Sequence, residues 1–93
     1  MLRRFIIERE IPRVGSLDSE QMKAAAGQSN SALQQLGSDV QWIESYVADD
    51  KTFCVYLATD EDAIRKHAAI SGFPASTITE VRRMIDPTTE RTG

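Results

Sequence analysis

Residue types suited to chemistry concentrate between Trp42 and Ala58, a stretch that holds the only tryptophan, both tyrosines and the only cysteine. Within it, Glu44 stands among apolar neighbours, where a carboxylate is costly to bury without a partner. Together with Glu8, further upstream, it is a candidate to bind a cation or, with a raised pKa, to act as a general acid or base. The structural alternative is that these acids form ion pairs with arginines on a solvated face or a dimer seam.

The only histidine, His67, is a second candidate, because imidazole titrates near neutrality and binds metals. Its structural alternative is a buried histidine that is hydrogen-bonded to a carbonyl or a hydroxyl group. We predict Glu44 and His67 as metal ligands, although a place under a helix-covered face would keep His67 away from Glu44. Cys54 has no basic neighbour to lower its pKa, which favours an inert thiol over a nucleophile or soft metal ligand. One histidine and one cysteine cannot form a zinc cluster within one chain.

The stretch predicts a β-hairpin, because two strand-like runs flank a polar turn at residues 49–51. A three-residue loop there pairs Tyr46 with Cys54 and Glu44 with Tyr56. Successive strand side chains point to opposite faces, so this register sorts the hairpin into two faces. The expected core face holds Ile43, Ser45, Val47, Phe53, Val55 and Leu57, and the other face holds Trp42, Glu44, Tyr46, Cys54 and Tyr56.

Around the hairpin, the 93-residue chain predicts the order strand, helix, strand, strand, helix, strand. This order predicts a ferredoxin-like βαββαβ sandwich of the α+β class, with a four-stranded antiparallel sheet and two helices on one face. We expect one domain over residues 1–87 and a flexible polar tail over residues 88–93. The expected strands cover residues 3–9, 40–48, 52–58 and 76–86, and the helices run from Asp18 to Gly37 and from Thr59 or Asp60 to Gly72.

The first predicted helix has capping residues at its start and residues of low helix propensity in its middle. Asp18 and Gln21 are spaced as a capping box. Gly27 and the serines that follow it disfavour helix, and the apolar stripe is thin. We expect the helix either to bend near Gly27 or to pack loosely.

Two helices cover only one face of such a sheet, so the other face meets solvent or a partner. The predicted register places aromatic side chains there, and an exposed aromatic patch marks a binding surface. Because two-fold homodimers are the commonest oligomers, we expect a dimeric α/β-barrel type of association around a pocket. The predicted pocket residues are Glu8, Trp42, Glu44, Tyr46, Cys54 and Tyr56.

Composition narrows the class of protein. The net charge of −3 argues against nucleic acid and anionic membrane as partners, since both favour a basic surface. No apolar run approaches the roughly 18 residues that span a bilayer, and the single cysteine gives no sign of an oxidising compartment. We therefore expect a cytoplasmic protein. No glycine-rich phosphate loop or dinucleotide fingerprint indicates a nucleotide or flavin.

Five segments carry a family resemblance: F-I-I-E-R at 5–9, W-I-E-S-Y-V at 42–47, D-K-T-F-C-V-Y-L-A at 50–58, H-A-A-I-S-G-F-P-A at 67–75 and E-V-R-R-M-I-D-P at 80–87. Together they resemble a bacterial family of small ferredoxin-like proteins of unassigned role, some of which are named nickel-binding proteins. The resemblance covers residues 5–87 and implies a ferredoxin-like homodimer. For function, it implies only that some relatives bind nickel.

Two functional hypotheses follow. The first is a small cytoplasmic ligand-binding protein, a homodimer that binds a divalent metal such as nickel. The alternative is a cofactor-free small enzyme, an isomerase or oxygenase, that acts on a hydrophobic metabolite in a pocket between the sheets. A closed apolar cavity of roughly 300 Å³ or more, faced by Glu44 or His67, would favour the enzyme. A strict monomer would favour a third function, an adaptor whose open face docks another protein.

Overall fold

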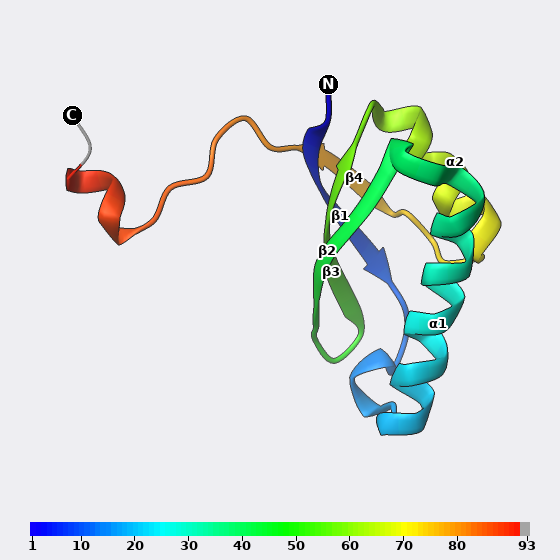
Figure 1. Ribbon diagram of the computed structural model, residues 1–93. Helices are drawn as coiled ribbons and strands as arrows, with labels where there is room; N and C mark the ends of the chain where they lie inside the picture. The colour runs from blue at the N-terminus through cyan, green and yellow to red at the C-terminus, as the bar shows by residue number, and fades with distance from the viewer. Residues whose placement is uncertain (92–93) are drawn as a thin grey trace.

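The computed structural model describes residues 1–91 as one antiparallel sheet with two α-helices on one face (Figure 1). The strand order is β2-β3-β1-β4, so the two central strands are neighbours in space and far apart in sequence. This is the predicted ferredoxin-like βαββαβ arrangement, and the prediction of the fold is confirmed. The elements are β1 (Arg3–Glu10), α1 (Ser19–Leu36), β2 (Val40–Val47), β3 (Lys51–Ala58), α2 (Glu61–Ser71) and β4 (Thr77–Glu80), with short 3-10 helices η1 (Val14–Ser16), η2 (Gly37–Asp39) and η3 (Pro87–Arg91).

Local signals set the helix ends where the sequence predicts them. The Asp18 carboxylate accepts from the backbone N–H of Gln21 at 2.8 Å, and the Gln21 side chain accepts from the backbone N–H of Asp18 at 3.0 Å. This reciprocal capping box satisfies donors that the first turn of α1 leaves free. Asp60 caps α2 with its side chain alone, which accepts from the backbone N–H of Ala63 at 2.9 Å, and Gly72 ends this helix with a φ of 80°, which glycine adopts without strain.

The core lies between the sheet and the helices. Phe5 and Ile7 of β1 point to this covered face, and the register pairs them with Tyr56 and Cys54 of β3. Ile64 of α2 packs on them. All five side chains are almost completely removed from solvent, so burial of apolar surface on the covered face is the main stabilising contribution.

The predicted register of the hairpin is wrong at its turn. Ala48 donates its N–H to the carbonyl of Lys51 at 2.8 Å, and Val47 pairs with Thr52. The turn therefore has two central residues, Asp49 and Asp50, instead of three. A one-residue slip of this kind moves every side chain of a strand to the opposite face.

A β-bulge at Ile43 adds a second one-residue shift, which returns the first part of β2 to its predicted face relative to β3. Trp42 pairs with Tyr56, whereas Glu44 pairs with Val55, so Ile43 has no partner across the ladder. Trp42 consequently lies on the covered face with Tyr56, while Glu44 lies on the open face. The predicted grouping of the hairpin is thereby corrected: Trp42, Ser45, Val47, Cys54 and Tyr56 lie on the covered side, and Ile43, Glu44, Tyr46, Phe53, Val55 and Leu57 on the open side.

The last strand is shorter than expected. β4 ends at Glu80, and the N–H of Val81 makes the final bond to Arg4. Residues 82–86 leave the sheet. These residues and η3 form an arm that projects on the side opposite the helices (Figure 1). The expected polar tail begins within η3, and its last two residues, 92 and 93, lie outside the described part of the chain.

Candidate functional site

The sheet divides the six predicted pocket residues into two sets. Glu8, Glu44 and Tyr46 lie on the open face, and Glu8 is engaged there in an ion pair with Lys51 at 3.2 Å. Trp42, Cys54 and Tyr56 lie beneath the helices. The two-residue turn separates Tyr46 from Cys54 and Tyr56, and the bulge at Ile43 separates Trp42 from Glu44. The structure therefore has two candidate sites, back to back.

The first candidate is a hollow of about 340 Å³ on the open face, which we call the open-face hollow. At its wall the Tyr46 hydroxyl donates a hydrogen bond to the Glu44 carboxylate. The hydrogen bond and the negative charge of Glu44 raise the pKa of Tyr46, so the phenol stays protonated and is a donor at neutral pH. The full lining is Arg4, Ile6, Ile43, Glu44, Tyr46, Val55, Val81, Arg83 and Met84.

The second candidate is an apolar cavity of about 260 Å³ between the sheet and the N-terminal half of α1, which we call the α1 cavity. Three of its polar groups lie together: the Tyr56 hydroxyl is 3.5 Å from the Ser29 hydroxyl and 3.5 Å from the Arg9 guanidinium. Burial raises the pKa of Tyr56, an effect that the Ser29 and Arg9 contacts partly oppose. The lining is Arg9, Ile11, Val14, Leu17, Met22, Ala25, Ala26, Ser29, Trp42, Ser45, Val47, Thr52, Cys54, Tyr56 and Phe73.

His67 is 1% exposed and lies beside the polar end of the α1 cavity. Its Nε2 is 3.3 Å from the Ser29 hydroxyl and 3.4 Å from the Ser29 carbonyl oxygen, and its ring centroid is 5.2 Å from that of Tyr56. Burial lowers the pKa of His67, and nearby Arg9 lowers it further. The imidazole is therefore neutral at physiological pH. Its Nδ1 has no hydrogen-bond partner among residues 1–91.

The two predicted metal ligands do not meet. Glu44 lies on the open face and His67 under the helices, so the thickness of the sheet separates them within one chain. Cys54 is buried, and its sulfur is 3.5 Å from the Thr52 hydroxyl. Across the described residues, no three side chains of the His, Cys, Asp and Glu types come together in a metal-binding arrangement. The chemistry of this donor set does not fit a nickel site within a single chain.

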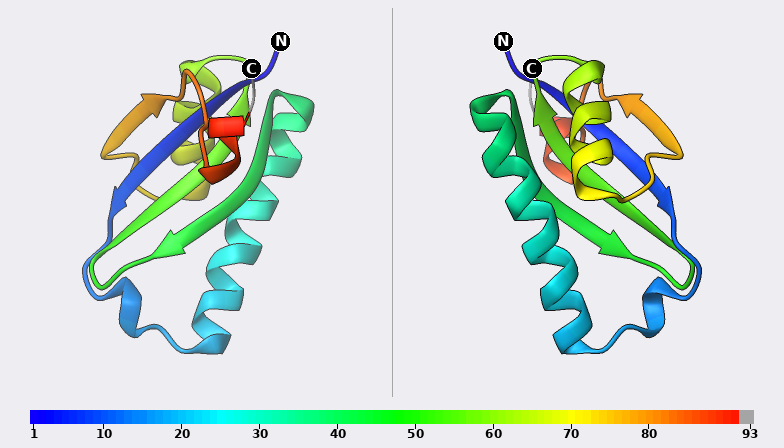
Figure 2. Two further views of the ribbon diagram at one scale, coloured as in Figure 1. Left: turned by 90° about the vertical axis from the view of Figure 1, so that its left-hand side faces the viewer. Right: turned by 90° about the vertical axis from the view of Figure 1, so that its right-hand side faces the viewer.

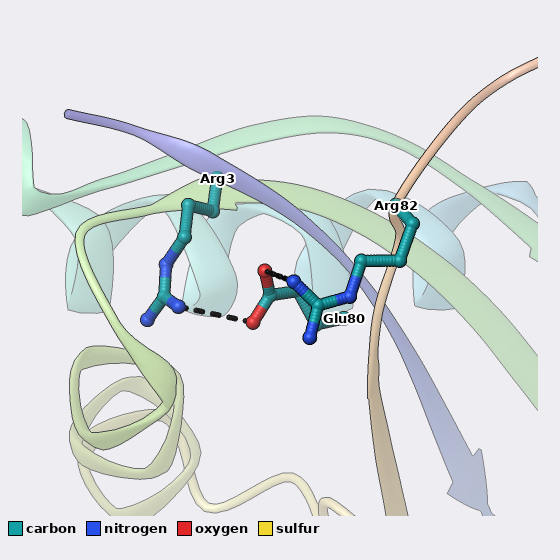
Figure 3. Close-up of polar contacts among 3 residues, drawn as sticks. All are labelled: Arg3, Glu80 and Arg82. Atoms are coloured by element: carbon teal, nitrogen blue, oxygen red, sulfur yellow. Dashed lines mark hydrogen bonds and ion pairs between the residues drawn. The ribbon is translucent and has the colours of Figure 1, made fainter.

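Glu80, the acidic residue of β4, also forms ion pairs. Glu80 lies on the helix side of the sheet, since it pairs with buried Phe5. Arg3 and Arg82 flank its carboxylate, with nitrogen–oxygen distances of 3.0 and 3.5 Å (Figure 3). Glu80 therefore does not contribute to the open-face hollow.

Sequence reasoning gave Arg9 no role beyond a surface ion pair, whereas the structure buries it. The alternation of Phe5, Ile7 and Arg9 places the guanidinium on the covered face, where it is 3% exposed. The sequence contains the information needed to predict this burial. Arg9 follows Phe5 and Ile7 at two-residue spacing in one strand, so all three side chains lie on the same face.

The fold and these two cavities define a small ferredoxin-like α+β domain with a ligand-sized space on each side of its sheet. The model of the family described as nickel responsive protein, SCO4226-like, matches residues 5–81, and the chain belongs to this family. The crystal structure of SCO4226 from Streptomyces coelicolor A3(2) has the same fold, with a TM-score of 0.73 and 15% sequence identity over 88% of this chain and 99% of that chain. No curated protein matches the sequence. Neither α-helix of the described chain has the length and hydropathy to span a bilayer.

Proposed function

We propose that the protein is a cytoplasmic ligand-binding homodimer whose ligand is a divalent metal such as nickel. Two copies would stack their open faces in a dimeric α/β-barrel type of association. The observation that carries the proposal is the uncovered apolar face of the sheet. The family's description as nickel responsive supports nickel as the metal.

Several large apolar side chains on the open face remain in contact with water in the single chain. Ile43 is 47% exposed and Tyr46 is 59% exposed, and Ile6 and Phe53 beside them are more than one-third exposed. A contiguous patch of this kind on a small domain favours association. A second copy is the simplest partner, because a two-fold axis makes one patch complementary to itself.

A dimer also supplies what one chain lacks for binding a metal. A two-fold axis duplicates each ligand, so two copies would bring two Glu44 carboxylates to the shared space. Nickel accepts oxygen and imidazole ligands. His67 is on the other side of the sheet, so the proposed site uses oxygen ligands from the open faces.

Light scattering on the purified chain tests the dimer. Phe53→Asp places a charge on the open face and should give a monomer, whereas wild type gives the mass of two chains. Ile70→Asp is the matched control, because Ile70 is also exposed but lies on α2, away from the open face. A dimer that survives Phe53→Asp as well as it survives Ile70→Asp would contradict the stacking of open faces.

Equilibrium dialysis of tag-free protein against nickel, cobalt and zinc tests the metal. We expect nickel to bind more tightly than the other two, and Glu44→Gln to weaken nickel binding by at least about ten-fold. Glu61→Gln is the control, since Glu61 is an exposed acid on α2 that pairs with Arg65. Equal affinity for the three metals, or equal affinity in the two variants, would exclude a nickel site at Glu44.

One observation favours the enzyme as a second candidate. The open-face hollow, at about 340 Å³, is within the size range of small-molecule sites, and the Glu44–Tyr46 pair at its wall would serve as an acid–base couple. In this candidate the dimer encloses a hydrophobic metabolite beside Glu44. Incubation with a bacterial metabolite extract, followed by mass spectrometry, would show a compound consumed by wild type and unchanged with Glu44→Gln. Equal turnover by both would exclude Glu44 as the catalytic group.

A further inference from the structure

The α1 cavity contains one charged side chain, Arg9, in a mostly apolar lining. Its guanidinium donates to the carbonyl oxygens of Pro74 at 2.8 Å and Phe73 at 3.3 Å, and lies 3.5 Å from the Tyr56 hydroxyl. The guanidinium carbon is 5.8 Å from the centroid of the Tyr56 ring. Within residues 1–91, no carboxylate forms an ion pair with Arg9.

These contacts leave the charge of Arg9 uncompensated. Carbonyl and hydroxyl dipoles solvate a cation in part, but a buried charge without a counter-ion is destabilising. A guanidinium has five N–H donors and suits a carboxylate, which it binds through two parallel hydrogen bonds. The polar end of the cavity is therefore complementary to an anion.

The rest of the cavity is complementary to an apolar group. The helix runs unbroken past Gly27 and presents Ala25, Ala26 and Ser29 to the cavity, and these short side chains leave its volume unfilled. An apolar cavity of about 150 Å³ binds benzene, so about 260 Å³ has room for a larger ring or a medium alkyl chain. Of the sequence-based alternatives for this helix, loose packing agrees with the structure.

A backbone contact between η1 and the hairpin turn positions two of the residues that line the cavity. Gly15 of η1 donates its N–H to the carbonyl of Asp49 at 2.9 Å, which ties the segment before α1 to the hairpin turn. An added Cβ at Gly15 would lie 2.6 Å from the carbonyl oxygen of Ala48, so only glycine permits this approach. Val14 and Leu17, on either side of this contact, line the cavity.

We propose that the α1 cavity binds a small amphipathic monocarboxylic acid, with its carboxylate on the Arg9 guanidinium and the Tyr56 hydroxyl and its hydrocarbon part beneath α1. The raised pKa of Tyr56 keeps its hydroxyl protonated, so it donates to the carboxylate. This site is on the opposite side of the sheet from the proposed metal site and does not depend on it.

Octanoate, octanol and octylammonium have the same hydrocarbon chain and test the charge preference. Isothermal titration calorimetry on the full chain measures their affinities, and the fluorescence of Trp42, the only tryptophan and a cavity-lining residue, locates binding. We expect octanoate to bind saturably, at least ten-fold more tightly than octanol, with a change in Trp42 emission and no binding of octylammonium. Octanol binding as tightly as octanoate, or no saturable binding of octanoate, would overturn the proposal.

Variants test the position. Ala25→Leu fills the cavity and should weaken octanoate binding at least ten-fold, whereas Ala24→Leu, on the exposed side of α1, should leave the affinity unchanged. Arg9→Met keeps most of the volume and removes the charge, so it should abolish the preference for octanoate over octanol. If Arg9→Met does not fold, the comparison of Ala25→Leu with Ala24→Leu still shows whether octanoate binds in the α1 cavity. Equal octanoate affinity in Ala25→Leu and Ala24→Leu would place binding elsewhere and overturn the proposal.

Discussion

His67 is buried against Tyr56 with only one of its ring nitrogens hydrogen-bonded within the described chain. A histidine in this setting costs free energy to protonate, because burial disfavours the imidazolium and the Arg9 guanidinium repels it. Ser29, its polar neighbour on α1, is neutral. The protonation of His67 therefore makes the folding stability depend on pH, and this effect does not require a bound ligand.

We predict that His67 makes the protein less stable in mild acid. The unfolded chain binds a proton at His67 near pH 6.5, whereas the native chain, with the lower pKa, does not. The free energy of unfolding should then fall as the pH decreases below about 6.5, with a slope of up to about 1.4 kcal/mol per pH unit. Above that pH the residue is neutral in both states and adds no slope.

Urea unfolding between pH 7.5 and about 5 measures this slope. His67→Gln retains a hydrogen-bonding side chain and removes the titration, so its stability should be flatter over the same range. Identical slopes for wild type and His67→Gln would contradict the prediction.

At the scale of helices and strands, the sequence predicts those features that are determined by residues close together in the chain. The side-chain caps at Asp18 and Asp60 and the glycines that end the two helices involve residues three or four positions apart, and the helices begin and end as predicted. The register of the hairpin depends on which side chains the helices cover, and this is a contact between distant parts of the chain. Ile43 has no local mark of a bulge, so the separation of Trp42 from Glu44 could not be predicted.

Two glycines of the helices should respond to alanine in opposite directions. At Gly27, an added Cβ meets nothing within 4 Å, and alanine is the better helix former, so Gly27→Ala should stabilise the protein by about 1 kcal/mol. At Gly72, the nearest atom is an ordinary 3.6 Å away, but the φ of 80° strains any side chain. Gly72→Ala should therefore destabilise by about 1–2 kcal/mol.

Urea or thermal unfolding of the two variants under the same conditions measures both effects. Each glycine serves as the control for the other, because the substitution adds the same methyl group. Changes of the same sign would mean that backbone conformation does not determine the difference.

At the scale of the whole molecule, the C-terminal arm leaves its large apolar side chains mostly in contact with water. Met84 is 63% exposed and Ile85 is 71% exposed, and the arm leaves on the same side as the open face (Figure 1). Met84 also lines the open-face hollow. In the proposed dimer, this arm would contact the partner subunit.

We predict that removing residues 82–93 weakens the dimer without unfolding the domain. The core lies wholly within earlier residues, so the circular dichroism spectrum should keep its helical and strand content. The dissociation constant from analytical ultracentrifugation should rise at least about ten-fold, which corresponds to about 1.4 kcal/mol. The double substitution Met84→Ser and Ile85→Ser should give the same direction of change. An unchanged dissociation constant would exclude the arm from the dimer contact.

The bulge at Ile43 has a last consequence, for aggregation. β2 and β4 are the edges of the sheet, and an exposed edge can add a strand from another molecule (Figure 2). On β2 the bulge interrupts the regular spacing of free N–H and C=O groups, and β4 offers only four residues. Bulged and short edges are poor templates for strand addition, so the sheet resists growth into fibrils, and its face remains the surface through which copies can meet.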